Sequence, residues 1–245
     1  MSTAENSTLK CPIHSFESMG AVDGPGLRFV VFTQGCNLQC KYCQNRDTWT
    51  HSGGTFYTVD ELLEKILRYK NYFTASRGGV TISGGDPLIH MQFLIELFKK
   101  LKEHNIHTAI DTSGVFYLTP GMIELINLTD LFLLDIKCIN DEICKDLTSV
   151  SNQKELEFAK YLSSIGKPMW IRQVLVPGYT DKEEDLLKLK EFLASLSSVQ
   201  KVEILPYHDM GKHKWLEMGL TYPLEGVRVA NSEDVDRAKK ILGLN

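Results

Sequence analysis

The sequence lacks the features that would place the chain in a membrane, a secretory pathway or a disulfide-rich class. Its 245 residues contain no apolar run of about 18 residues, the length that spans a membrane as a helix. The first twenty residues contain no apolar segment typical of a signal peptide, so we expect none, and we expect a cytoplasmic protein. Six cysteines are too few for a disulfide scaffold. They are interpreted instead as metal ligands, reactive thiols or core residues.

An excess of positive charge is also missing. The 27 Lys and Arg residues face 31 Asp and Glu residues, and the formal net charge of −4 argues against wholesale nucleic-acid binding. Hydrophobic residues make up 43% and charged residues 24%, which excludes a disordered or collagen-like chain. We therefore expect a globular protein without a nucleic-acid or membrane partner, folded as one domain over residues 1–245.

Short β-rich runs alternate along the chain with amphipathic helical runs. The pattern predicts strands over Arg28–Thr33, Gly79–Ser83, His107–Asp111, Leu131–Lys137, Met169–Val176 and Lys201–Leu205. It predicts helices over Val59–Phe73, Met91–Glu103, Pro120–Leu128, Gln153–Ile165, Lys182–Leu196 and Ser232–Leu242. The alternation indicates an α/β fold of βαβ units with a parallel sheet. Six units are fewer than the eight of a closed barrel, so the sheet is either open and doubly wound or an incomplete barrel.

Polar clusters follow most of the predicted strands. Ser83-Gly84-Gly85-Asp86-Pro87 follows the second strand, Asp111-Thr112-Ser113-Gly114 ends the third, and Asp135-Ile136-Lys137 ends the fourth. Pro206-Tyr207-His208 ends the sixth. Parallel α/β folds bind ligands at the carboxyl ends of their strands. The clusters therefore predict one shared site at that edge.

Three cysteines follow the first predicted strand. Cys36, Cys40 and Cys43 are spaced C-x3-C-x2-C, and thiolates suit zinc, copper(I) or iron–sulfur clusters. A closed zinc site needs a fourth ligand, for which His51 is the nearest downstream candidate. The alternative is a [4Fe–4S] cluster on three cysteines, which leaves one iron open for substrate.

The other three cysteines match no cluster spacing. Cys11, Cys138 and Cys144 are scattered through the chain. We interpret them as packing residues or free thiols, with a second metal site as the less favoured alternative.

The cysteine motif, with Tyr42 before the last cysteine, resembles the radical S-adenosylmethionine (SAM) superfamily. Longer segments resemble the pyruvate formate-lyase activating enzymes, a family of glycyl radical enzyme activases: IHSFES at 13–18, VDGPG at 22–26, GLRFVVFTQGCNLQCKYCQNRDTW at 26–49 and LPYHDMGKHKW at 205–215. The resemblance extends from about Ile13 to Gly243. It implies a single radical SAM domain with a partial (β/α)6 TIM-like barrel, in agreement with the count of six units.

The resemblance also implies an activity, with its cofactors and partners. A [4Fe–4S] cluster on Cys36, Cys40 and Cys43 would cleave SAM reductively to methionine and a 5′-deoxyadenosyl radical. The radical would remove a hydrogen atom from one glycine of pyruvate formate-lyase, a step of anaerobic glucose metabolism. The electron would come from a flavodoxin or ferredoxin-type donor, and the enzyme would be a monomer.

The family roles are assigned to matching positions of this chain. The implied SAM contacts are Tyr42, Cys43, Gln44, Gly84, Gly85, Asp135, Ile136, Lys137 and His208. Asp111, Thr112 and Asp135 match a monovalent-cation site. Asp23 and Arg172 match positions that hold the substrate glycine loop, and an arginine in an apolar strand needs an anionic partner.

Two positions depart from the family pattern. Asp86 stands where the motif Gly-Gly-Glu has glutamate, which favours a role for the backbone here over one for the carboxylate. Gln44 stands where relatives often have histidine; it can form hydrogen bonds but does not titrate near neutral pH.

Three other functions remain open from the sequence. The first is a radical SAM enzyme that acts on a small molecule, and the second is an activase of another glycyl radical enzyme. The third is a zinc-binding adaptor without catalysis.

Overall fold

The computed structural model describes residues 9–244, which form two compact units. The first unit comprises the chain up to Cys36 together with Thr50–Thr112 and Tyr117–Phe132. The second comprises Asn37–Trp49, Ser113–Phe116 and the chain from Leu133 onward. Residues 1–8 and 245 of the predicted single domain lie outside the described residues.

The strands of the described chain follow the hydrogen-bonded order β3-β1-β2-β4-β5-β6-β7-β8. Pairing is parallel for β2 with β4, β4 with β5 and β7 with β8, and antiparallel for β1 with β2 and with β3. The order has β3 and β8 at its two ends, so the sheet is not closed within residues 9–244. The strands are β1 Lys10–Gly20, β2 Arg28–Thr33, β3 Thr55–Thr58, β4 Gly79–Gly84, β5 His107–Thr112, β6 Leu131–Asp135, β7 Met169–Leu175 and β8 Val199–Pro206.

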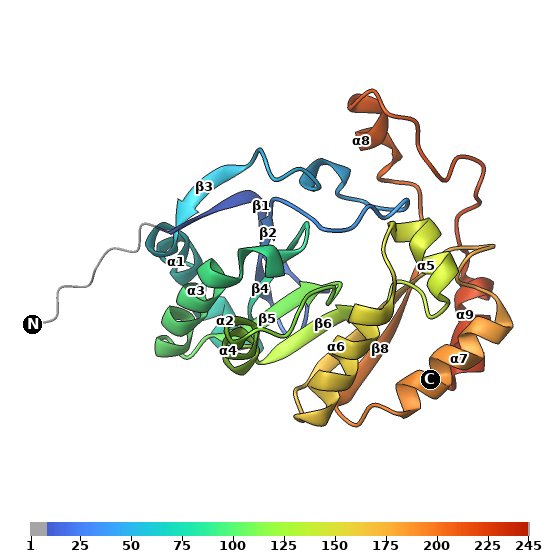
Figure 1. The fold of residues 1–245 in the computed structure, drawn as a ribbon. Helices are drawn as coiled ribbons and strands as arrows, with labels where there is room; N and C mark the ends of the chain where they lie inside the picture. The colour runs from blue at the N-terminus through green and yellow to red at the C-terminus, as the bar shows by residue number, and fades with distance from the viewer. Residues whose placement is uncertain (1–8, 245) are drawn as a thin grey trace, which may run out of the picture. The chain divides into compact units, whose positions relative to one another are not determined.

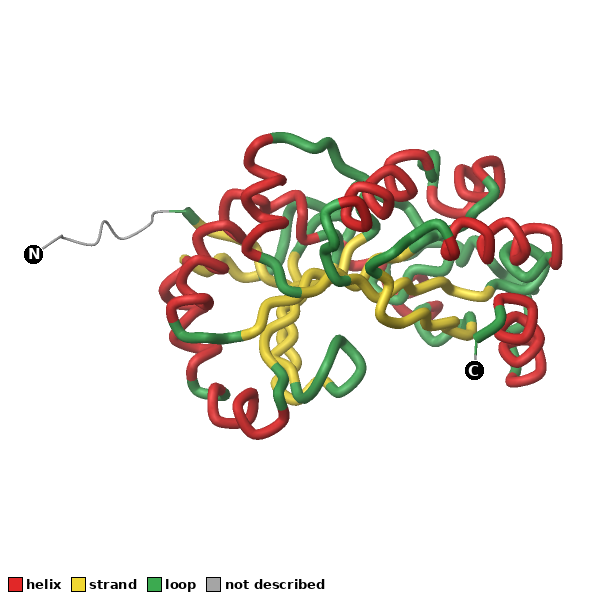
Figure 2. Tube along the Cα trace, turned by 90° about the horizontal axis from the view of Figure 1, so that it is seen from below, coloured by secondary structure: helices red, strands yellow, loops and turns green. Residues whose placement is uncertain are grey.

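Helices follow most of these strands (Figure 1). In the first unit α3 packs against α1 and α4; in the second, α9 packs against α7 and β8. In Figure 2, the helices of the first unit lie on the outer side of its strands. The helices are α1 Val59–Leu67, α2 Lys70–Ser76, α3 Met91–Glu103, α4 Pro120–Leu128, α5 Asp141–Thr148, α6 Gln153–Ser164, α7 Glu183–Ala194, α8 Lys212–Glu217 and α9 Ser232–Leu242, with 3₁₀ turns η1 Arg46–Thr48 and η2 Pro87–His90.

The α/β class, the parallel pairing and all six predicted strands are confirmed, with ends that differ by at most two residues. The predicted helix Val59–Phe73 is wrong in one respect, because the chain turns at Arg68 and Tyr69 and starts a second helix. The strands β1 and β3 were not predicted. Proline and several polar residues interrupt the apolar pattern of β1, and β3 is short and partly exposed.

No helix among residues 9–244 is long and apolar enough to cross a membrane.

Every residue of β2 except Phe32 is buried, as expected for a strand covered on both faces. Thr58 precedes α1 as its N-cap and forms a capping box. The Thr58 hydroxyl accepts a hydrogen bond from Glu61 N at 3.2 Å, and the Glu61 carboxylate accepts one from Thr58 N at 2.8 Å.

The first unit buries one arginine completely at the start of β2. The Arg28 guanidinium donates hydrogen bonds to Thr81 Oγ1 at 2.5 Å, to Pro25 O at 3.2 Å and to Val80 O. Thr81 Oγ1 donates in turn to Asp23 O at 2.6 Å. A buried cation is tolerated only where its donors find acceptors. Arg28 therefore fixes the 22–26 loop to β4.

We predict that Arg28→Met lowers the free energy of unfolding by about 3 kcal/mol, because it leaves buried carbonyl groups without donors. Arg68→Met, at an exposed arginine paired with Glu64, should change it by less than about 0.5 kcal/mol. Urea denaturation of both variants measures the difference. Equal stability of the two would show that the Arg28 hydrogen bonds contribute nothing to the fold.

Candidate functional site

The loop after β4 is held by backbone hydrogen bonds to the end of β2. Gly85 N donates to Thr33 O at 3.0 Å, and Asp86 N donates to Gly35 O at 2.8 Å. Gly84 has a φ of +113°, and a Cβ there would lie 2.2 Å from Thr33 N. Only glycine allows this approach. The glycine pair predicted as a cofactor contact thus also packs against the strand that leads to Cys36.

The Asp86 side chain is used within the protein. Its Oδ1 accepts hydrogen bonds from Leu88 N at 3.2 Å and from Thr112 Oγ1 at 2.7 Å, and only 1% of the residue is exposed. The Ser83 hydroxyl donates to Asp111 Oδ2 at 2.8 Å. The first unit therefore brings the predicted residues at the ends of β4 and β5 together.

In the second unit, the C-terminal end of α5 supports the cysteine loop. Gln39 N donates to Thr148 O at 2.9 Å and Lys41 N donates to Leu147 O at 2.8 Å, so that both neighbours of Cys40 are fixed. The Lys41 ammonium also pairs with Asp146 at 2.7 Å. These backbone bonds use carbonyl groups that a helix end leaves unpaired.

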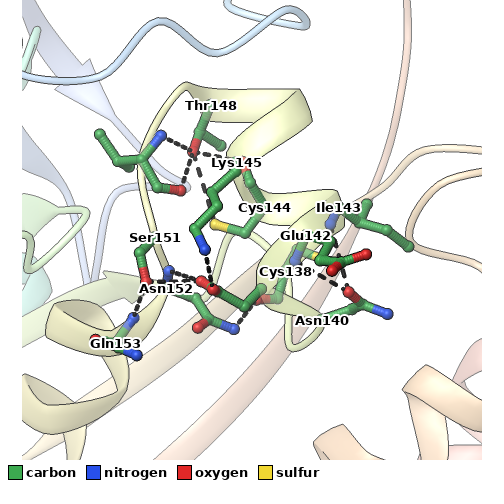
Figure 3. A network of polar contacts seen from close by, with 12 residues as sticks. Cys138, Asn140, Glu142, Ile143, Cys144, Lys145, Thr148, Ser151, Asn152 and Gln153 are labelled. Carbon is green, nitrogen blue, oxygen red and sulfur yellow. Dashed lines mark hydrogen bonds and ion pairs between the residues drawn. The ribbon is translucent and has the colours of Figure 1, made fainter.

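A network of polar contacts fixes α5 itself (Figure 3). The Asn140 side chain accepts from the N–H groups of Glu142 and Ile143 and so caps the helix. Asn152, which is buried, donates to Cys138 O at 3.0 Å and to Ile139 O at 2.8 Å. The turns on both sides of α5 are therefore tied together.

The 205–215 segment packs on the other side of the cysteine loop. A Cβ at Gly211 would lie 3.0 Å from Cys43 O, and the Gln44 amide donates to His208 O at 3.0 Å. Lys214 pairs with Asp47 at 2.9 Å. These contacts bring the predicted residues Cys43, Gln44 and His208 into one region of the second unit.

Two aromatic rings extend this contact. The Trp215 and Trp49 rings meet edge to face at 5.3 Å. The Arg46 guanidinium lies 4.1 Å from the centre of the Trp49 ring, a cation–π contact.

A buried group of ionisable side chains surrounds Lys137. Its Nζ donates to Asp135 Oδ2 at 2.5 Å, and its backbone N–H donates to Glu155 Oε1 at 3.1 Å. Burial acts to lower the pKa of Lys137, but Asp135 and the other acidic groups nearby raise it well above its usual value. Burial raises the pKa of Glu155 and of Tyr42. Lys137 therefore stays charged and is suited to a carboxylate.

Nine buried polar atoms of the second unit have no hydrogen-bond partner among the described residues, and Tyr42 OH, His208 Nδ1 and Glu155 Oε2 are three of them. Buried polar atoms are nearly always paired, so atoms without a partner are candidates for contact with a bound ligand. Tyr42 and His208 are also two of the predicted SAM contacts. This observation fits a polar cofactor beside the cysteine loop.

All six cysteines are free thiols. Cys43 Sγ accepts a hydrogen bond from Asn45 N at 3.3 Å, the kind of bond that tunes the sulfur ligands of iron–sulfur clusters. Within residues 9–244, no group of three or more His, Cys, Asp and Glu side chains is gathered as a site for a single metal ion. The three thiols on one short loop nonetheless match the donors that an iron–sulfur cluster takes.

The remaining cysteines are in the core. Burial raises the pKa of Cys11 and of Cys144 to about 12 and that of Cys138 to about 11. Such thiols are unreactive at neutral pH, which agrees with their interpretation as packing residues.

The two predicted peptide-binding residues lie in different units. Arg172, which is buried in β7, donates from Nε to Glu203 Oε2 of β8 at 3.0 Å, so the expected anionic partner is Glu203. Asp23 lies in the 22–26 loop that Arg28 fixes. Ile136 N donates to Arg172 O at 2.9 Å, which connects the predicted cofactor segment with β7.

The sequence reading missed Glu155 and Asn152, whose side chains hold the turn after β6. Glu155 is in a helical pattern where polar residues usually face solvent, and Asn152 directly precedes that helix. The one signal was position, since Glu155 precedes Phe158 and Ala159 by about one helical turn and Leu162 by about two turns, and so faces the same side.

Comparisons with known proteins agree on a family. The family model described as "Radical SAM superfamily" matches residues 30–189, more than half of the chain. The chain is 47% identical over 231 residues to a pyruvate formate-lyase 1-activating enzyme of Escherichia coli strain K12, with 94% of both chains covered. It is 51% identical over 243 residues to a pyruvate formate-lyase-activating enzyme of Staphylococcus epidermidis, with 97% of both covered.

Solved structures are similar as well. A domain of a pyruvate-formate lyase-activating enzyme from Bacteroides vulgatus is 27% identical with a TM-score of 0.57, covering 68% of this chain and 93% of that one. Streptococcus suis SuiB bound to a precursor peptide has a TM-score of 0.66 at 16% identity, covering 87% of this chain and 44% of that one. The second likeness concerns the fold alone.

We predict that Asp86→Asn, which keeps the Oδ1 acceptor, lowers the free energy of unfolding by no more than about 1 kcal/mol. Asp86→Ala should lower it by about 2 kcal/mol, because Leu88 N and Thr112 Oγ1 lose their acceptor. Urea denaturation measures both values, and a SAM titration of the Asn variant should give nearly wild-type affinity. A large loss of affinity in a stable Asp86→Asn protein would instead assign the carboxylate to the cofactor.

Proposed function

The chain belongs to the radical SAM superfamily and to its pyruvate formate-lyase-activating enzymes, and from this premise we propose how its own residues perform the activation. The enzyme uses a [4Fe–4S] cluster and SAM to generate a glycyl radical on pyruvate formate-lyase. When bound, these two groups supply a 5′-deoxyadenosyl radical that removes a hydrogen atom from the glycine. The protein binds and orients them and keeps other hydrogen donors away.

Cys36, Cys40 and Cys43 would hold the cluster. The short loop that carries them is braced by α5 on one side and by the 205–215 segment on the other. Such bracing limits the movement of the thiolates and so fixes the position of the cluster. Only three protein ligands are available in the motif, which leaves one coordination position for SAM.

Tyr42, Gln44 and His208 would contact SAM beside this loop. The unpaired Tyr42 OH and His208 Nδ1 support this assignment, since a polar cofactor would supply their partners. Asp135, Ile136 and Lys137 complete the proposed contacts in the second unit. The charged Lys137 suits the SAM carboxylate. Its ammonium group would bind that carboxylate while it also pairs with Asp135.

Gly84 and Gly85 would present their backbone to the methionyl part of SAM. The Gly85 N–H already donates to Thr33 O, so we propose that the carbonyl groups of this loop make the contact. We further propose Asp111, Thr112 and Asp135 as ligands of a monovalent cation, for which hard oxygen donors are suited. Asp23 and Arg172 would hold the glycine loop of the partner enzyme.

The observation that carries the proposal is the similarity over nearly the whole chain to activating enzymes, at 47–51% identity. It includes segments outside the cysteine motif, such as 205–215, that small-molecule radical SAM enzymes are not expected to share. The cytoplasmic location, the flavodoxin or ferredoxin-type electron donor, the monomeric state and the single domain stay predictions.

We expect anaerobically reconstituted protein to hold about four iron and four sulfide per chain. Cys36→Ala, Cys40→Ala and Cys43→Ala should each abolish SAM cleavage, measured as 5′-deoxyadenosine by liquid chromatography. Cys11→Ala and Cys138→Ala, at buried cysteines outside the loop, are the matched controls and should keep it. Full SAM cleavage in any variant of the first group would refute the ligand assignment.

We predict that Asp23→Ala and Arg172→Ala keep the cluster and bind SAM but lose glycyl radical formation on pyruvate formate-lyase by tenfold or more. One charge-assisted contact contributes about 1.5–3 kcal/mol. Cluster absorbance, SAM binding and radical yield are measured on the same anaerobic sample.

Glu203→Gln separates two roles of Arg172, because it removes the ion pair but leaves the arginine in place. Radical yield close to wild type in Glu203→Gln supports a peptide-binding role for Arg172. Loss of cluster or SAM binding in the alanine variants would place both residues in the core site instead.

A further inference from the structure

The first unit has a cavity of about 400 Å³ at the amino ends of β4 and β5. The candidate site residues Gly84 and Thr112 end the same strands at their opposite, carboxyl ends. The cavity is therefore separate from the residues proposed to bind SAM. It is lined by Lys70, Phe73, Thr74, Arg77, Gly78, His104, Asn105, Ile106 and His107.

The lining has positive charge without negative charge. Lys70 and Arg77 are cations, His104 and His107 can donate hydrogen bonds, and the lining contains no Asp or Glu. The side chains of Lys70, Arg77 and His104 make no hydrogen bond or ion pair with residues 9–244. By contrast, Lys99, Lys100 and Lys102 on the neighbouring helix α3 each pair with a carboxylate. Unpaired cations gathered around one cavity attract an anion.

The lining also contains a hydrogen-bond donor on His107 and two apolar side chains. His107 Nδ1 can only accept the hydrogen bond from Arg28 Nη2 at 3.3 Å, so its ring hydrogen is on Nε2, which becomes a donor. Phe73 and Ile106 in the lining are buried apolar side chains. A ligand with an anionic end and an apolar body matches both.

Arg77 has an unusual backbone for its residue type. Its φ of +56° lies in the left-handed region, where glycine is favoured at the end of a helix. Glycine would relieve this strain but would remove the guanidinium from the cavity. The arginine therefore has a cost to the fold that a binding role would offset.

We propose that this cavity is a binding site for a small phosphate monoester. The two charges of Lys70 and Arg77 match the charge of such an ester, which is close to −2 at neutral pH. The volume lies within the range of small-molecule sites, and the apolar residues receive the organic part.

The test is calorimetric titration of the anaerobically reconstituted full chain at low ionic strength with phenyl phosphate, inorganic phosphate and phenol. Phenyl phosphate should bind more tightly than inorganic phosphate, phenol should not bind, and added salt should weaken both anions. Saturating SAM should not displace phenyl phosphate. Displacement by SAM, or the absence of saturable binding, would overturn the proposal.

Lys70→Gln and Arg77→Gly should each weaken phenyl phosphate binding about tenfold, as expected for the loss of one charged contact. Arg77→Gly should also unfold at the same or a higher temperature, which separates lost binding from lost folding. Arg68→Gln is the matched control, since it removes an exposed charge of the same unit outside the cavity. Equal weakening by Arg68→Gln would mean that general charge, and not the cavity, attracts the anion.

Discussion

The backbone hydrogen bonds between the end of β2 and the loop after β4 are the constraint on which the first unit's part of the site depends. They require a residue without a side chain at Gly84, because any Cβ would collide with Thr33. They also fix the residues just before Cys36. Asp86 then connects this loop to the end of β5 through Thr112. A change in one of these loops is therefore transmitted to the others.

In the second unit, different contacts hold the cysteine loop in position. Its cysteine loop has no regular structure apart from η1, so it is held from outside by carbonyl groups of α5 and by close packing of Gly211. The polar network of Figure 3 in turn makes α5 a fixed support. Loops that hold catalytic groups need such support, because a displacement of about 1 Å is enough to lower a rate strongly.

Much of this could be predicted from the sequence because the signals are local. The period of apolar residues predicted the strands of the parallel sheet, and the spacing of three cysteines predicted a cluster loop. The antiparallel strands β1 and β3 were not predicted, since their pairing depends on partners distant in sequence. The roles of Glu155 and Asn152 were not predicted for a similar reason. Their burial and their contacts with the turn after β6 arise only from tertiary packing.

The resemblance assigned roles that local patterns alone could not. No periodicity indicates that Arg172 faces Glu203 or that Lys137 lies beside Asp135. The structure adds the physical reason why a charged Lys137 persists in a buried place, namely the Asp135 carboxylate beside it. It also shows that the Gly85 N–H is already bonded to Thr33 O, which is why we propose carbonyl contacts for the loop after β4.

The most direct test of the proposed activation is electron paramagnetic resonance on pyruvate formate-lyase after anaerobic incubation with this protein, SAM and a reductant. We expect a glycyl radical signal that requires SAM and changes shape when the partner is made with α-deuterated glycine. Cleavage of SAM without any radical on the partner would contradict it, and would favour a small molecule or another glycyl radical enzyme as the substrate.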